Sequence, residues 1–205
     1  MAELNAQQLV ALLGKARWHV AARTFGNNHA TLIGILVDCW VSADPAHSAL
    51  EGAPSFKKRG TRTSGSGICD ALLCEAGRPV GLVEVEGGKK EEVVQKVGHY
   101  FEAQYDDLSS LEFAVCLFYA YAPAGRGLRR EYPLPADKDV IGTVIEVSRQ
   151  HPTKLLAVIE LHKSFGRSLS GIRARSEYYS GHLSRVQATV YRAGEPQCSA
   201  TLFQV

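Results

Sequence analysis

The first forty residues show two hydrophobic patterns, and each predicts a helix. Over residues 6–25 the apolar positions follow the spacing of one face of an amphipathic helix: Leu9, Leu12, Leu13, Ala16 and Val20. The segment GNN at 26–28 breaks this pattern and offers an N-cap to the next segment, HATLIGILVDCWV at 29–41. Because that second segment is almost entirely apolar, we expect a buried helix there.

Farther along the chain, short apolar runs alternate with helical periodicity. The run LEFAVCLFYAYA (111–122) is continuously apolar and rich in aromatic and β-branched residues, which predicts a central strand buried on both faces. The other expected elements, in chain order, are strands at 68–74 and 79–86, a helix at 89–107, a helix at 135–150 and a strand at 153–162. Residues 43–67, rich in Gly, Pro, Ser and basic side chains, are expected to form a long, mobile loop, of a kind that is often functional.

The end of the chain has a different pattern. Apolar and polar residues alternate over about 171–205, with Gly-containing turns, which predicts an antiparallel, half-exposed meander. The element order predicts an α/β (α+β) protein with a mixed central sheet flanked by helices and a C-terminal antiparallel β extension. We expect one domain over 1–205 with a core at about 6–162.

Composition narrows the class of protein. The chain has 205 residues, is 45% hydrophobic and 21% charged, and carries a formal net charge of +2, which suits a globular domain without a general basic surface. No apolar run reaches the roughly 18–20 residues that cross a bilayer, and the N-terminus does not read as a signal peptide. The five cysteines form no CxxC pair, so we expect free thiols and a cytoplasmic, intracellular protein. The lack of a long apolar run predicts that the protein does not contact a membrane.

Three carboxylates stand out in the two predicted strands at 68–86. Glu84 and Glu86 project from one side of their strand, and Asp70 falls opposite Glu84 on the same face if Cys74 pairs near Val80. Like charges so close raise their pKa values or bind a cation, and oxygen ligands suit Mg²⁺ or Mn²⁺. The glycines at 87–88 would leave this strand end open to a ligand. The alternative is that the two glutamates form the solvated face of an amphipathic strand.

These residues carry a resemblance to the PD-(D/E)xK nuclease superfamily, the restriction-endonuclease-like fold. The segments CDALL and RPVGLVEVE, followed by a helix, are similar to its active-site hairpin, with Asp70 as the first Asp and Glu84 as the Asp/Glu of the triplet. Glu86 takes the position of the usual Lys, giving an ExE variant, and Cys69 replaces the usual Pro. Gln95 and Tyr100 resemble a Gln/Tyr pair found on the helix of some members.

The resemblance implies a metal-dependent nuclease acting on DNA with Mg²⁺ or Mn²⁺ as cofactor. Asp70, Glu84 and Glu86 would bind the metal, and His29 would replace a glutamate that many members carry on an early helix. Some restriction-type members resemble this chain in using a Glu at the Lys position. Lys89 or Lys90 would then supply the displaced positive charge, with an exposed helix surface as the alternative for both.

Two other functions stay open at this point. The chain could be a catalytically inactive member of the same fold that binds nucleic acid or a partner protein, or an unrelated enzyme using Glu84 and Glu86 as an acid/base pair, for example on a glycoside. A homodimer is a further possibility. The residues expected to contact nucleic acid are Lys57, Lys58, Arg59, Arg62, Arg173 and Arg175, and Arg185, Gln187 and Tyr191 share the outward parity of the last two.

Overall fold

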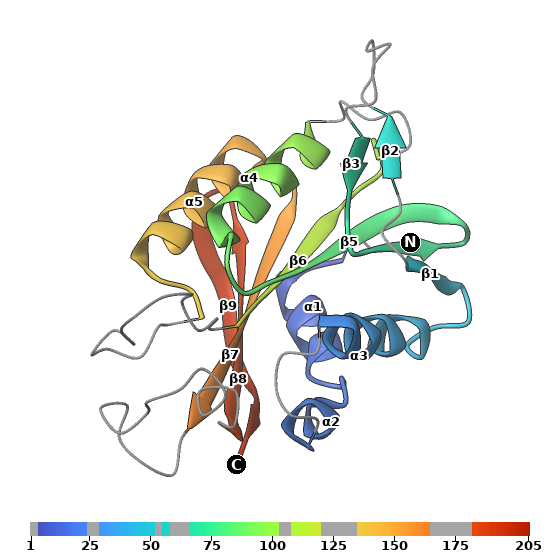
Figure 1. The fold of residues 1–205 in the computed structure, drawn as a ribbon. Coiled ribbons are helices and arrows are strands. Elements are labelled where there is room, and N and C mark those ends of the chain that lie inside the picture. Colours follow the sequence, from blue (N-terminus) through green and yellow to red (C-terminus); the bar gives the residue numbers. More distant parts are fainter. Residues whose placement is uncertain are drawn as a thin grey trace.

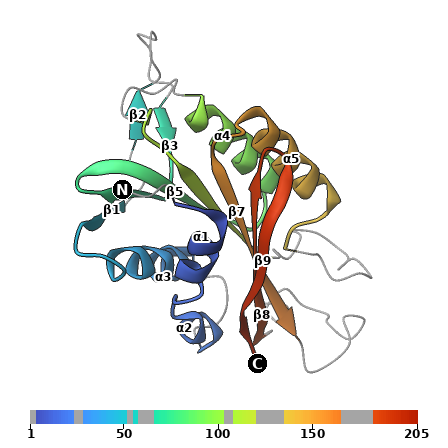
Figure 2. The same cartoon turned by 180° about the vertical axis from the view of Figure 1, so that it is seen from behind.

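A seven-stranded mixed sheet runs through the molecule between two layers of helices (Figures 1 and 2). Its strand order is β1-β4-β5-β6-β7-β8-β9; β5, β6 and β7 are mutually parallel, and the other pairs are antiparallel. The strands are β1 (His47–Glu51), β4 (Ala71–Glu75), β5 (Arg78–Glu86), β6 (Phe113–Tyr119), β7 (Leu155–Ser164), β8 (His182–Arg192) and β9 (Glu195–Gln204). The predicted mixed sheet flanked by helices is confirmed.

The structure is a computed structural model. It describes residues 4–23, 29–51, 55–57, 66–102, 108–119, 135–164 and 182–205. Within those ranges it does not describe the side chains of 22–23, 55–57, 66–67, 164 and 182.

Among the described residues, three helices cover one face of the sheet and two cover the other. The first layer contains α1 (Ala6–Leu13), α2 (Trp18–Arg23) and α3 (His29–Val41), and the second contains α4 (Lys90–Phe101) and α5 (Lys138–Gln150) (Figures 1 and 2). The helix predicted over 6–25 is two helices, because the chain bends to bury Trp18, whose Nε1–H donates to the Leu13 carbonyl at 3.0 Å. No helix in the described ranges is long and apolar enough to cross a membrane.

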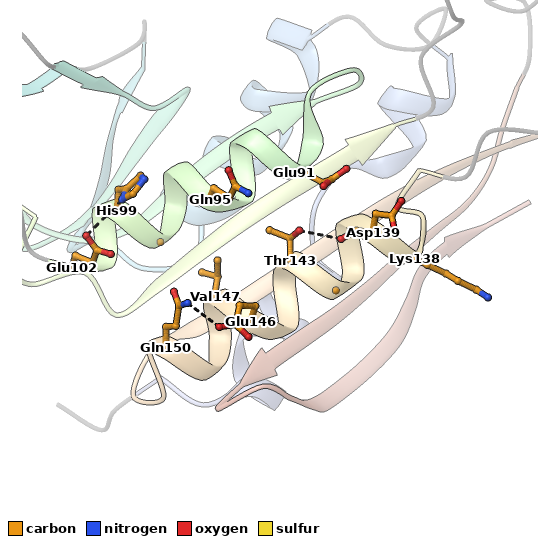
Figure 3. A pocket seen from close by; sticks show the side chains of 12 residues that line it. Glu91, Gln95, His99, Glu102, Lys138, Asp139, Thr143, Glu146, Val147 and Gln150 are labelled. Carbon is orange, nitrogen blue, oxygen red and sulfur yellow. Dashed lines mark hydrogen bonds and ion pairs between the residues drawn. The ribbon is translucent and has the colours of Figure 1, made fainter.

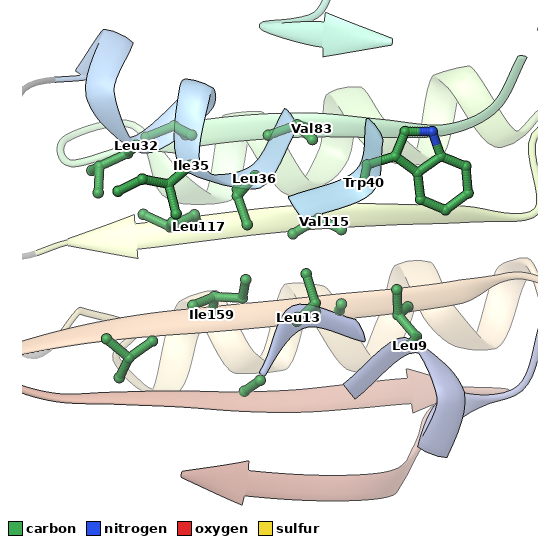
Figure 4. Packing of buried hydrophobic residues seen from close by; sticks show 14 of the residues in the cluster. Leu9, Leu13, Leu32, Ile35, Leu36, Trp40, Val83, Val115, Leu117 and Ile159 are labelled. Carbon is green, nitrogen blue, oxygen red and sulfur yellow. The ribbon is translucent and has the colours of Figure 1, made fainter. Parts of the chain in front are cut away.

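Each layer of helices buries its own hydrophobic cluster against the sheet. Figure 4 shows the first cluster, where Leu36 of α3 packs beside Val115 and Leu117 of β6. The intervening β6 residues, such as Cys116 and Phe118, belong to the second cluster, beneath α4 and α5. Because helices cover both faces of β6, its side chains are buried on both sides, which explains its continuous apolar sequence.

The described parts of segment 43–67 include strands, which differs from the loop that the sequence predicts. The strands are β1, which pairs with β4 at the edge of the sheet, and the separate pair β2 (Ser55–Lys57) and β3 (Ser66–Ile68). The prediction of a long, mobile loop is therefore wrong for β1, for β2 and for the start of β3. An edge strand buries few side chains, and Leu50 of β1 is 56% exposed, so the hydrophobic pattern carries little sign of it.

The C-terminal β8–β9 hairpin agrees with the predicted antiparallel extension. Its turn at Ala193 and Gly194 has positive φ values of 53° and 82°, which suit the right-handed twist of the flanking strands. Residues 171–181 of the predicted meander lie outside the described residues.

Candidate functional site

The β4–β5 hairpin places Asp70 beside Glu84, as the sequence predicts. The Asp70 N–H donates to the Val83 carbonyl at 3.1 Å, which continues the strand pairing past the first residue of β4. A bulge near the turn sets Cys74 opposite Pro79, one residue from the predicted register. That shift stays at the turn, so the acidic end keeps the expected alignment.

Asp70 and His29 meet at the carboxyl end of β5. The Val85 N–H donates to Asp70 Oδ2 at 2.7 Å, and His29 Nε2 of α3 lies 2.9 Å from the Val85 carbonyl oxygen. His29 Nε2 is also 3.3 Å from Asp70 Oδ2. One imidazole nitrogen, one carboxylate oxygen and one carbonyl oxygen therefore converge, and the Asp70 side chain is 21% exposed.

Glu84 lies on the face of β5 that α4 covers, and it is buried there. Its side chain is 3% exposed, and Lys96 Nζ of α4 lies 2.8 Å from Oε1 and donates to Oε2 at 2.9 Å. The same amino group donates to the Ile68 carbonyl at 2.8 Å. Burial raises the pKa of Glu84 to about 7; the charge and hydrogen bond of Lys96 oppose that rise, and Asp70 adds to it. The carboxyl therefore titrates near neutral pH, where it can exchange a proton.

This raised pKa predicts an unusual dependence of stability on pH. The folded protein holds the Glu84 proton more tightly than the unfolded chain, so the stabilisation is present below the ordinary value of 4.5 and is lost as pH rises through about 7. Relative to Glu84→Gln, the wild type should lose about 3 kcal/mol of unfolding free energy between about pH 4 and pH 8. Urea unfolding of both proteins across that range measures the difference, and parallel curves would contradict the assignment.

Glu86 has a third environment. Its Oε1 accepts the backbone N–H groups of Gly87 and Gly88 at 2.7 and 2.6 Å. Gly87 packs against the Tyr119 ring, where a Cβ would lie 2.3 Å from a ring carbon. The glycines thus fold back on Glu86 and Tyr119, which differs from the predicted opening for a ligand. The three carboxylates are neighbours along the hairpin, but each contacts different groups.

Lys96 is a residue of the candidate site that the sequence analysis did not identify. The lysines predicted to supply the positive charge lie elsewhere: Lys89 is exposed and pairs with Glu92 at 3.1 Å, and Lys90 lies near Asp137 and Glu86 at the start of α4. The available signal was helical spacing. Lys96 lies one turn before the buried Tyr100 on the helix that directly follows the acidic hairpin.

The predicted helix pair Gln95 and Tyr100 is split between two surfaces. Tyr100 is fully buried, with Lys96 Nζ 6.0 Å from its ring centre, so it adjoins the Glu84 pair. Gln95 is exposed and lines a groove of about 710 Å³ between α4 and α5, as Figure 3 shows. Of these two residues, therefore, only Tyr100 lies next to a hairpin carboxylate.

Most of the residues predicted to contact nucleic acid lie outside the part of the chain that the structure describes. Lys58, Arg59, Arg62, Arg173 and Arg175 lie outside the described residues, and only the backbone of Lys57, at the end of β2, is described. The structure does describe β8, and the side chains that were predicted to face outward from it are not all exposed. Tyr191 is 8% exposed beneath α5, whereas Arg185 is exposed.

The donors beside Asp70 fit a small divalent cation in part. Among the described residues, no group of three or more His, Cys, Asp or Glu side chains is close enough to hold a metal ion, so Glu84 and Glu86 do not join His29 and Asp70 in one cluster. Octahedral Mg²⁺ with ligands at about 2.0–2.1 Å has neighbouring ligands about 3 Å apart. The separations of 2.9 and 3.3 Å around His29 Nε2 match that spacing, and Mg²⁺ usually keeps several waters.

The His29 tautomer decides what this arrangement binds. A proton on Nε2 makes the ring a donor to the Val85 carbonyl, whereas a proton on Nδ1 leaves Nε2 as a metal ligand. No family model, no curated protein and no solved structure matches the chain, so the case for a function rests on the geometry of this site.

Proposed function

We propose that the protein is a metal-dependent phosphodiesterase that hydrolyses the DNA backbone at the carboxyl end of β5. One observation carries this proposal: His29 Nε2, Asp70 Oδ2 and the Val85 carbonyl converge within 3.3 Å beside a buried Glu84–Lys96 pair. The order of strand, strand, helix and strand around this point supports the resemblance to the PD-(D/E)xK superfamily.

The chain's own groups divide the work of such a reaction. A divalent cation held by His29 and Asp70 would supply Lewis acidity and neutralise phosphate charge. The Val85 N–H fixes the orientation of the Asp70 carboxylate. The superfamily motif usually has a Lys where this chain has Glu86, and Lys96 of α4 supplies that positive charge instead. Its Nζ lies 2.8 Å from Glu84 Oε1.

Glu84 is the group suited to move a proton. Its pKa of about 7 lets it hold or release a proton near neutral pH, within the buried pair that it forms with Lys96. Tyr100 and the surrounding apolar side chains keep water from the far side of the pair. The functional unit is therefore Asp70 with His29 at the carboxyl end of β5, and Glu84 with Lys96 buried beneath α4.

Cleavage assays test this proposal directly. Linear duplex, circular duplex and single-stranded DNA are incubated with Mg²⁺, Mn²⁺ or a chelator, and we expect products only with the metals. His29→Ala should raise the metal concentration for half-maximal rate by about 10-fold, because it removes one donor. His19→Ala, an exposed histidine of α2, is the control and should leave that concentration unchanged.

The absence of metal-dependent products with every DNA form would overturn the proposal. Calorimetric titration of Mn²⁺ then separates the alternatives. Salt-dependent DNA binding without metal uptake would favour the catalytically inactive module.

A further inference from the structure

A second polar group lies on the same sheet face as Glu84, at the carboxyl end of β7. Glu160 and His162 of β7 share this face because Glu86, Phe118 and Glu160 form one row across β5, β6 and β7. His162 is paired with Arg185 of β8. Since neighbouring strands lie about 4.8 Å apart and a strand rises about 3.3 Å per residue, Glu160 is roughly 10 Å from the Glu86 position. Arg185 lies one strand farther and two residues along β8 from the Glu160 partner Gln187, so it is roughly 16 Å from the Glu86 position.

The contacts in this group hold Arg185 beside the sheet edge. Arg185 Nη2 lies 3.5 Å from His162 Nε2, and His162 Nε2 lies 3.9 Å from Glu160 Oε1. Burial and the Arg185 charge both lower the pKa of His162, so a neutral ring can accept the guanidinium N–H. His162 and Glu160 are 18% and 20% exposed, whereas Arg185 is exposed to solvent.

The acidic members of this edge have their own partners. The Ala136 N–H, just before α5, donates to the Glu160 carboxylate, whose charge also interacts with Arg185 and Lys90. Lys90 interacts in turn with Asp137, Glu86 and Glu160. Lys90 therefore offsets the negative charge between the hairpin and β8, and Arg185 is exposed to solvent.

We propose that Arg185 binds a backbone phosphate of the substrate strand, so that the DNA runs across the carboxyl edge of the sheet from β5 to β8. This inference rests on the proposed function, since it places substrate beyond the attacked phosphate. A planar guanidinium offers paired N–H groups that match phosphate oxygens, and His162 restrains it from one side. A separation of roughly 16 Å corresponds to a phosphate a few nucleotides away.

The test measures DNA binding in the Asp70→Asn background, which is expected to cut DNA about 10³-fold more slowly than the wild type. Affinity for single-stranded and duplex DNA is measured between about 50 and 200 mM salt, because each lost phosphate contact lowers the salt slope by about one. Arg185→Gln should lower the slope by about one and weaken binding several-fold. Arg185→Lys should keep the slope and still weaken binding, because it retains the charge but loses the fork.

Arg78→Gln is the matched control, since Arg78 lies at the opposite end of β5 and pairs with Glu112 at 3.0 Å. It should leave the slope unchanged, and thermal unfolding confirms that each variant folds. An unchanged slope in Arg185→Gln overturns the inference, as does an equal loss in Arg78→Gln. Wild-type cleavage is scored separately, so a failed phosphate contact is distinguished from a failed phosphodiesterase assignment.

Discussion

Replacing Asp70 by asparagine is expected to lower the rate of metal-dependent DNA cleavage by about 10³-fold. Asparagine has nearly the same shape and can still accept the Val85 N–H, so the strand end should keep its geometry. The substitution removes the negative charge that faces His29 Nε2 at 3.3 Å. Loss of one preorganised electrostatic group in an active site costs roughly 3–4 kcal/mol in the transition state, which corresponds to that rate.

The measurement is a single-turnover rate at saturating Mn²⁺, with unfolding followed in parallel. Asp38→Asn is the control, because Asp38 lies on α3 like His29 but pairs with Arg17 at 3.2 Å near the surface. If Asp70→Asn cuts DNA as fast as the wild type, the site assigned to the end of β5 is wrong. A loss of folding in Asp70→Asn alone would instead assign a structural role to this carboxylate.

Lys96→Met should produce the second large effect, on both rate and stability. Lys96 lowers the pKa of Glu84 against the burial that raises it, so its loss raises that pKa further and leaves a buried carboxylate without a counter-charge. The variant's unfolding free energy should therefore fall more steeply than the wild type's as pH rises, with a deficit of about 1–3 kcal/mol near pH 8. Cleavage should fall by about 10²-fold through loss of the positive charge.

Lys89→Met gives the matched comparison on the same helix. Lys89 is 73% exposed and pairs with Glu92, so its removal should change stability by less than about 0.5 kcal/mol. Chemical unfolding at about pH 5 and pH 8 separates the two variants. A pH-independent deficit in Lys96→Met would mean that Lys96 stabilises α4 by packing alone, without controlling Glu84.

The register of the acidic hairpin could be predicted from the local sequence pattern. Two short apolar runs joined by a turn of few residues allow few pairings, so Asp70 had to fall near Glu84. The bulge at Cys74 was not visible in the sequence, because it depends on how the turn meets the edge strand. For the same reason β1 was missed, since its pairing comes from β4 and not from its own pattern.

The sequence by itself determined the alternation of strands and helices, the acidic end of the hairpin and the buried helix that carries His29, because periodicity and burial are encoded locally. Only the tertiary structure decided which groups those carboxylates meet. Asp70 contacts His29 because α3 crosses the end of β5, and Glu84 contacts Lys96 because α4 packs on the other face. Such contacts join residues distant along the chain, and no local spacing specifies them.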